Sequence, residues 1–107
     1  MYESIALFVD NYAKEVAQLG FSIRREDLDN IQKIENIMRE ILHIDDELDK
    51  LGNENYIVCA ANRVALIKIL TNLRAAYEVM DTITLADILE YELLNEIESL
   101  LNELNAK

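Results

Sequence analysis

The chain has 107 residues, an ordinary length for one domain, and its 51% hydrophobic content supplies enough apolar surface for a single core. Its 21 acidic and 10 basic residues give a net charge of −11, which repels phosphate backbones and anionic membrane surfaces. The charge therefore argues against binding to nucleic acid or to a membrane. We expect a single domain over residues 1–107, with a cationic surface as the preferred kind of partner.

The N-terminus and the cysteine content indicate a reducing compartment. The first four residues lack the basic start and the apolar run of a signal peptide. Cys59 is the sole cysteine, so it cannot form an internal disulfide. Its apolar sequence neighbours predict a buried, unreactive thiol. Together these features predict a cytoplasmic protein.

Two amphipathic helices are predicted in the first half of the chain. Apolar side chains recur every three or four residues over residues 2–19, which predicts a helix that stops at Gly20. The same spacing over residues 28–51 predicts a second helix that stops at Gly52. Glycine is favoured just after the last turn of a helix, and the chain holds only these two glycines and no proline. This punctuation favours helical hairpins.

The third predicted helix is apolar around its whole circumference. It opens near residues 53–55, where an asparagine can cap it, and runs to Met80. Apolar residues on every face are typical of a helix enclosed by others. Four charged residues interrupt the run, so we exclude a membrane span. Three neighbours of similar length can leave part of such a helix uncovered, which favours a homodimer.

A fourth helix is predicted to begin at Thr84. Thr84 followed by Asp87 resembles a capping box, and Ile83 can pack onto Ile88 as a hydrophobic staple. Helices joined by short links must alternate in direction. The sequence therefore predicts an all-α fold, an antiparallel up-and-down four-helix bundle. The predicted inner stripe of the fourth helix is Ala86, Leu89, Leu93, Ile97, Leu100 and Leu104.

Two acidic residues fall on apolar stripes and need partners. Folding the second helix onto the third brings Asp45 level with Arg63, and folding the third onto the fourth brings Glu90 level with Arg74. We predict two structural ion pairs, Asp45 with Arg63 and Glu90 with Arg74, that fix the register between neighbours. An anion-binding pocket built from the two arginines is the functional alternative.

Glu40 and His43 reproduce the Glu-x-x-His spacing of di-iron bundles. Both fall outside the predicted core stripe, and one histidine cannot supply the usual pair. The acids Asp45 and Asp46 beside His43 also argue against a phosphorelay histidine, because they repel an incoming phosphoryl group. We therefore expect solvated side chains here, with no metal and no other cofactor.

An acidic constellation keeps one enzyme alternative open. Asp45, Asp46 and Asp49, taken with Glu78 and Asp81, resemble the acidic motifs by which all-α nucleotide pyrophosphohydrolases hold magnesium. Asp46 and Glu78 are expected to project outward, as solvated acids do. A magnesium-dependent pyrophosphohydrolase would require the acids to converge on one cavity.

Tyr91 points away from the inner stripe of the fourth helix and lies among carboxylates. An outward aromatic ring in such a setting is typical of an interface, because aromatic side chains concentrate binding energy. The predicted partner-binding residues are Asp87, Tyr91, Glu92 and Leu94.

The segment Ala-Asp-Ile-Leu-Glu-Tyr-Glu-Leu, residues 86–93, resembles a stretch near the C-terminus of a family of small, uncharacterised helical bacterial proteins. The resemblance covers little more than the fourth helix. It implies a bacterial origin and a cytosolic accessory role rather than a reaction. We therefore expect a non-enzymatic interaction module, such as an adaptor, chaperone or neutralising partner, that recognises a basic protein through an acidic helix face.

Overall fold

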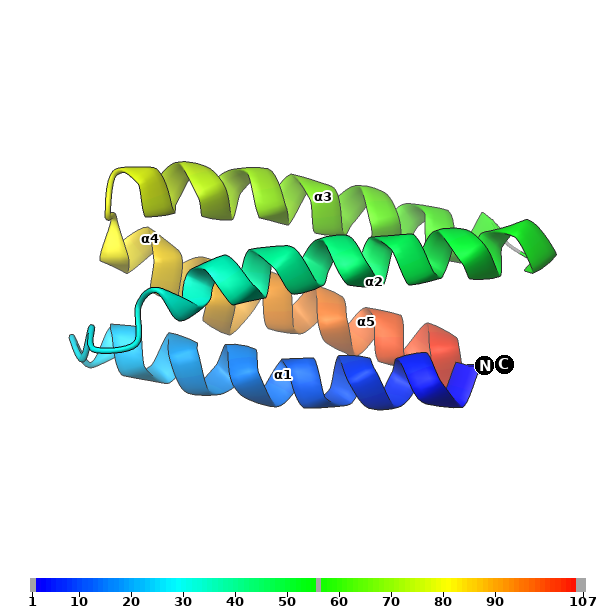
Figure 1. The fold of residues 1–107 in the computed structure, drawn as a ribbon, viewed down its shortest axis with the longest axis horizontal. Helices are drawn as coiled ribbons and strands as arrows, with labels where there is room; N and C mark the ends of the chain where they lie inside the picture. The colour runs from blue at the N-terminus through cyan, green and yellow to red at the C-terminus, as the bar shows by residue number, and fades with distance from the viewer. Residues whose placement is uncertain (1, 56, 106–107) are drawn as a thin grey trace.

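The computed structural model describes the backbone of residues 2–55 and 57–105, and the side chains of these residues apart from 2–3 and 52–59. The described residues form four helical rods (Figure 1). The first three rods are α1 (Tyr2–Arg24), α2 (Lys33–Asn55) and α3 (Ile57–Glu78). The fourth rod is continuous over residues 82–105 and consists of α4 (Thr82–Asp87), the π-helical turn η1 (Ile88–Leu93) and α5 (Leu94–Asn105).

The rods run alternately up and down. Each rod packs on two others: α1 and α3 both contact α2 on one side and the fourth rod on the other. The start of α1, the end of α5 and the end of α2 lie at one end of the molecule, and the α1–α2 and α3–α4 links lie at the opposite end (Figure 1). The molecule measures 42 × 21 × 18 Å. The fold is therefore the predicted all-α, antiparallel up-and-down four-helix bundle.

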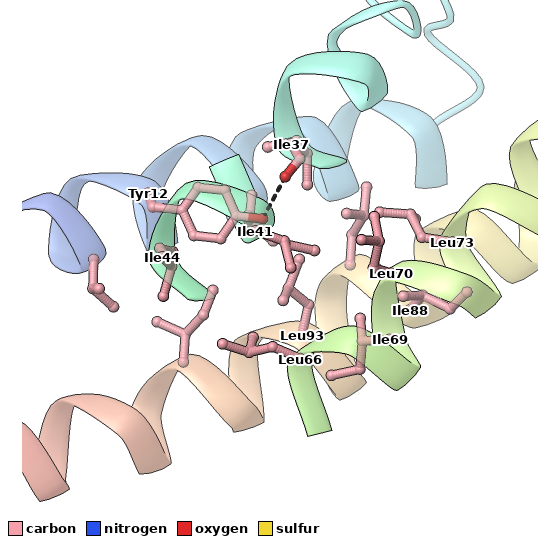
Figure 2. Packing of buried hydrophobic residues seen from close by; sticks show 14 of the residues in the cluster. Tyr12, Ile37, Ile41, Ile44, Leu66, Ile69, Leu70, Leu73, Ile88 and Leu93 are labelled. Carbon is pink, nitrogen blue, oxygen red and sulfur yellow. Dashed lines mark hydrogen bonds between the residues drawn. The ribbon is translucent and has the colours of Figure 1, made fainter. Parts of the chain in front are cut away.

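Aliphatic side chains from all four rods converge on one core (Figure 2). All six residues predicted for the inner stripe of the fourth helix are buried. Tyr12 of α1 is fully buried, and its hydroxyl donates a 2.9 Å hydrogen bond to the carbonyl oxygen of Ile37 in α2. Burial raises the pKa of this phenol far above its usual range, so Tyr12 stays protonated and joins α1 to α2.

Neither glycine ends a helix, contrary to the prediction. α1 continues through Gly20 to Arg24, and α2 continues through Gly52 to Asn55. The chain leaves α1 through Glu26, whose φ of 62° is left-handed. A Cβ at Gly20 would be crowded, because it would lie 3.0 Å from Cγ of Glu90 and 3.2 Å from Cβ of Leu89. Gly20 therefore permits close approach of α1 and η1.

The fourth rod begins two residues earlier than predicted, because a different residue caps it. The carboxylate of Asp81 accepts the backbone N–H of Thr84 at 3.1 Å and its hydroxyl at 2.6 Å. Aspartate is among the best N-cap residues, and Asp81, not Thr84, is the N-cap of α4. Ile83, which was predicted to pack onto Ile88, is 72% exposed.

The prediction that neighbours enclose the third helix was wrong. Leu66 and Leu73 of α3 are fully buried, but Val64 of α3 and Val79, the residue that follows its end, are 71% and 75% exposed. A corner position in a four-rod bundle offers α3 only two neighbours, α2 and the fourth rod. The all-round apolar pattern thus combines one core face with one exposed apolar face. None of the described helices is long and apolar enough to cross a membrane.

Candidate functional site

The π-helical turn η1 presents an aromatic ring to solvent beside the last turn of α1. Tyr91 lies in η1 and is 59% exposed. The guanidinium carbon of Arg24, the last residue of α1, lies 5.9 Å from the centroid of the Tyr91 ring, within the range of a cation–π contact. Turns of this kind inside α-helices often mark functional sites. The position of Tyr91 therefore makes this surface the first candidate.

Two carboxylates of the fourth rod hold Arg24 in place. Its Nη2 lies 2.6 Å from Oδ1 of Asp87, and its Nε lies 3.2 Å from Oε1 of Glu90. These hydrogen bonds, first to Asp87 and then to Glu90, raise the pKa of the Arg24 guanidinium. The guanidinium thus bridges α1 to the fourth rod while it contacts one face of the Tyr91 ring.

A second exposed aromatic ring lies on α1 close to this arrangement. Phe21, three residues before Arg24, is 58% exposed. The guanidinium carbon of Arg25 lies 5.2 Å from the centroid of the Phe21 ring. We call the set of five residues Phe21, Arg24, Asp87, Glu90 and Tyr91 the Tyr91 surface.

The four residues predicted to bind a partner do not form one patch. Asp87 and Tyr91 lie together beside Arg24. Glu92 is exposed on the other edge of the rod, in a shallow groove that α3 also lines. Leu94 is half-buried and packs against the core. Of the predicted residues, the structure therefore brings only Asp87 and Tyr91 together.

The structure brings Asp45 and Arg63 together across α2 and α3. Nε of Arg63 donates to Oδ1 of Asp45 at 2.8 Å, and Nη1 donates to Oδ1 of Asp49 at 2.9 Å. The hydrogen bond that Arg63 donates to Asp45 is the main reason that the pKa of the Arg63 guanidinium is raised. With two carboxylates on one guanidinium, this arrangement repels further anions.

The predicted pair between Glu90 and Arg74 is wrong. Glu90 faces α1 and contacts Arg24 instead. Arg74 follows Arg63 by eleven residues, about three turns, so both lie on the flank of α3 that faces α2. The fourth rod packs on the opposite flank, where Asn62 of α3 contacts Glu96. Arg74 lies on the same side of α3 as Arg63, which contacts α2, and it therefore points away from Glu90.

The acids of the hydrolase alternative lie far apart. Asp45 and Asp49 contact Arg63 near the start of α3, whereas Glu78 ends that helix, fifteen residues or about 22 Å further along. Asp81 serves as the cap of α4. Within the described part of the chain, no three His, Cys, Asp or Glu side chains gather in a way that could hold a metal ion. The side chain of Cys59 lies outside the described residues.

His43 and Glu40 both lie on the seam between α1 and α2. The ring of His43 is exposed and makes an edge-to-face contact with Phe8, with centroids 4.9 Å apart. It borders a pocket of about 520 Å³ that Ser4, Phe8 and Leu51 help to line. The two residues therefore line an interhelical surface, and Glu40 is half-buried there rather than fully solvated as expected.

Sequence reasoning missed a pair of carboxyl groups on this seam. Partial burial raises the pKa of Glu40 to about 7, and the nearby carboxyl of Glu15 adds to this by charge repulsion and by hydrogen bonding. The raised pKa favours the protonated form of Glu40 beside Glu15. The pattern of α2 alone could not show this pair, because it depends on the register of α1.

Sequence reasoning also missed a buried polar contact. Asn62 is 5% exposed, and its side-chain amide donates a 3.0 Å hydrogen bond to Glu96. The sequence could have indicated this contact, because Asn62 lies four residues before the core residue Leu66 and therefore on the same inner face of α3.

Comparison of the chain with known proteins found no matching family model, no matching curated protein and no matching solved structure. The resemblance of residues 86–93 to the bacterial family thus stays a prediction.

Proposed function

We propose that this chain is a non-enzymatic protein-interaction module that binds a basic partner protein through the Tyr91 surface. The observation that carries the proposal is the exposed Tyr91 ring with Arg24 fixed over it by Asp87 and Glu90. An aromatic anchor whose neighbours are already ordered loses less conformational entropy on binding than a mobile one. Tyrosine and arginine are also among the residues that contribute most to binding energy at interfaces.

The charge of the surrounding rod supports a basic partner. The fourth rod carries six acidic and no basic side chains. On the Tyr91 surface, the single positive charge of Arg24 is outweighed by Asp87 and Glu90. Such a face attracts a cationic protein over distances comparable to the Debye length and speeds its association. The acids of the fourth rod are Asp87, Glu90, Glu92, Glu96, Glu98 and Glu103.

In this proposal the protein acts in the cytoplasm as an adaptor, chaperone or neutralising partner, and it needs no cofactor. The lone cysteine supports a reducing compartment. The bacterial resemblance of residues 86–93 supports an accessory role. The exposed apolar side chains of Val64 in α3 and of Val79 just after it support a homodimer, because a monomer gains nothing from leaving them in water.

Affinity capture from bacterial lysate, read by quantitative mass spectrometry, tests the proposal. The tagged protein is compared with the variants Tyr91→Ala and Arg24→Ala, and Leu7→Ala serves as the matched control because Leu7 is an exposed α1 residue, 63% accessible. We expect one stoichiometric basic partner that the control retains. Loss of an interface anchor worth about 2 kcal/mol weakens binding roughly 30-fold, so both variants should lose that partner. Recovery of no partner beyond the protein's own subunits, or equal recovery by Tyr91→Ala, would contradict the proposal.

A further inference from the structure

A pocket of about 520 Å³ opens on the seam between α1 and α2, near the end of the bundle that holds the start of α1 (Figure 1). This seam is the loosest of the four, because α1 and α2 pack less closely along their length than any other adjacent rods. The volume is that of a small-molecule site, and such sites often lie between the helices of a bundle. The lining residues are Ser4, Ile5 and Phe8 of α1 and His43, Glu47 and Leu51 of α2.

The pocket combines an apolar floor with a polar rim. Ile5 and Leu51 are buried, and Phe8 is half-buried where it packs against the core. The other three lining side chains are polar and at least partly exposed. Pockets that bind small molecules are typically apolar with a few polar groups that fix the orientation of the ligand. This lining therefore suits a ligand with an apolar body and one polar group.

The aromatic and the acidic residues of the pocket lie at two levels along the bundle axis. The rings of Phe8 and His43 meet edge to face, with centroids 4.9 Å apart. Because α1 and α2 are antiparallel, Ser4 then lies level with Glu47, since each is four residues further towards the same end of the bundle. Four residues of helix rise about 6 Å. An aromatic level thus lies about 6 Å from a level that holds a hydroxyl and a carboxylate.

Glu47 gives the pocket a negative charge that its neighbours do not cancel. Its Oε1 lies 3.4 Å from Nζ of Lys50, but the same ammonium group lies 3.4 Å from Oδ2 of Asp46. One cation shared by two carboxylates leaves a net negative charge. None of the described lining residues is a lysine or an arginine. The net charge of −11 also attracts cations to the chain, so the pocket favours a cationic ligand over an anionic one.

We propose that this pocket binds an arylalkylamine, a small molecule that carries an aromatic ring and a protonated amine on a short alkyl chain. The ring lies beside Phe8 and His43, where aromatic rings pair with centroids about 4.5–7 Å apart. The ammonium group donates to the Glu47 carboxylate and to the hydroxyl of Ser4, whose lone pairs accept. A two-carbon chain joins ring and amine across the roughly 6 Å between the two levels.

Proton NMR titration of the full chain with phenethylamine at neutral pH tests the site. His43 is the only histidine of the chain, so its imidazole proton signals are assigned without ambiguity, and an aromatic ligand beside the ring shifts them. We expect a saturable shift with a dissociation constant of about a millimolar or below. Glu47→Gln removes the charge but keeps the shape of the side chain, and should weaken binding at least about fivefold. Glu98→Gln, the same change on an exposed stretch of the fourth rod, should bind as the wild type does.

Two further probes separate the contribution of the ring from that of the charge. Phenylpropionate has the same ring on a similar chain but carries a carboxylate, which Glu47 repels. It should therefore bind at least about tenfold more weakly than phenethylamine. Butylamine keeps the ammonium group but lacks the ring that Phe8 and His43 contact, so it should also bind more weakly.

Each contrary result removes a defined part of this proposal. No saturable shift of the His43 signals would overturn the site. Equal binding of phenethylamine and phenylpropionate, or equal binding by the wild type and Glu47→Gln, would overturn the cationic ligand. Butylamine that binds as tightly as phenethylamine would overturn the role of the aromatic level. Phe8 lies sixteen residues, or about 24 Å, before Arg24 on α1, so none of these results bears on partner capture through the Tyr91 surface.

Discussion

At the scale of single residues, polar contacts join the rods of this bundle at all four seams. Arg63 of α3 donates to Asp45 of α2, and three further contacts join residues that lie far apart in the chain. The Tyr12 hydroxyl crosses from α1 to α2, Arg24 crosses from α1 to the fourth rod, and Asn62 crosses from α3 to the fourth rod. Each partner lies at least 25 positions away in the chain. Contacts of this kind specify how the rods dock, which uniform aliphatic packing does less well.

The Glu15–Glu40 pair gives stability a defined pH dependence. The pKa of Glu40 is about 7 in the folded chain against 4.5 for an ordinary glutamate, so folding favours the protonated form. Its stabilising contribution is fully present below pH 4.5, declines as the pH rises, and is lost above about pH 7. Because Glu40 is only half-buried, we expect a decline of about 1 kcal/mol rather than the full value that the shift implies.

Denaturant unfolding between pH 4.5 and 8 measures this decline. Glu40→Gln should remove it and should be more stable than the wild type at pH 8. Glu98→Gln, a change on an exposed stretch of the fourth rod, should keep the wild-type profile. Parallel profiles for the wild type and Glu40→Gln would show that folding does not raise the pKa of Glu40.

Residue contacts could be predicted only where the neighbour was certain. The contact between Asp45 and Arg63 could be predicted because α2 and α3 are consecutive, antiparallel helices. In such a pair, residues equally distant from the connecting link lie at the same height along the bundle axis. The same rule predicted the height of Glu90 along the bundle axis. It does not predict which side of the helix faces which neighbouring rod. The order of the rods around the bundle determines which neighbour a side chain faces. In this bundle Glu90 faces α1 and contacts Arg24.

At the scale of elements, the apolar periodicity predicted how many rods form and, except for α3, which faces they bury. The ends of the rods depend on capping and close packing instead. Gly20 reads as a stop in the sequence, but close packing keeps it inside α1 against Leu89 and Glu90. η1 could not be read from the sequence either, because one extra residue in a turn barely disturbs the apolar spacing.

The contact between α1 and η1 makes a prediction about Gly20. Gly20→Ala gains about 1 kcal/mol of helix propensity, but its Cβ would lie 3.0 Å from Cγ of Glu90 and 3.2 Å from Cβ of Leu89. Overpacking typically costs about 1–3 kcal/mol, so we expect a net destabilisation of about 1 kcal/mol by urea unfolding.

A double-mutant cycle isolates the cause. In a Glu90→Ala background the closest obstructing atom is gone, so Gly20→Ala should cost less there than in the wild type. An equal effect in both backgrounds would show that α1 and η1 move apart without cost.

At the scale of the whole molecule, charge is divided unequally among the rods. The fourth rod and α2 carry most of the negative charge, while α3 is basic on balance. Composition alone gives the total but not this distribution, which needs the positions of the helices. The two proposed protein contacts have opposite electrostatics, since the Tyr91 surface attracts a cationic partner whereas a homodimer joins two anionic copies.

Salt should therefore act on the two contacts in opposite directions. Raising the ionic strength screens the repulsion between two chains of −11 charge and should lower the dissociation constant of the homodimer. The same change should weaken the capture of a basic partner through Tyr91. Sedimentation and quantitative capture at low and high salt measure both effects. A homodimer that weakens with salt would indicate an interface held by opposite charges rather than by apolar contacts.

The placement of the chain ends bears on how this protein can be joined to others. The start of α1 and the end of α5 share one end of the bundle, and Arg24 closes α1 about 33 Å further along that helix (Figure 1). A fusion or an immobilising tag at either end therefore emerges away from Tyr91. A bead or sensor surface would present the Tyr91 ring outward, and a short linker between the two ends would yield a circularly permuted bundle with that ring still accessible.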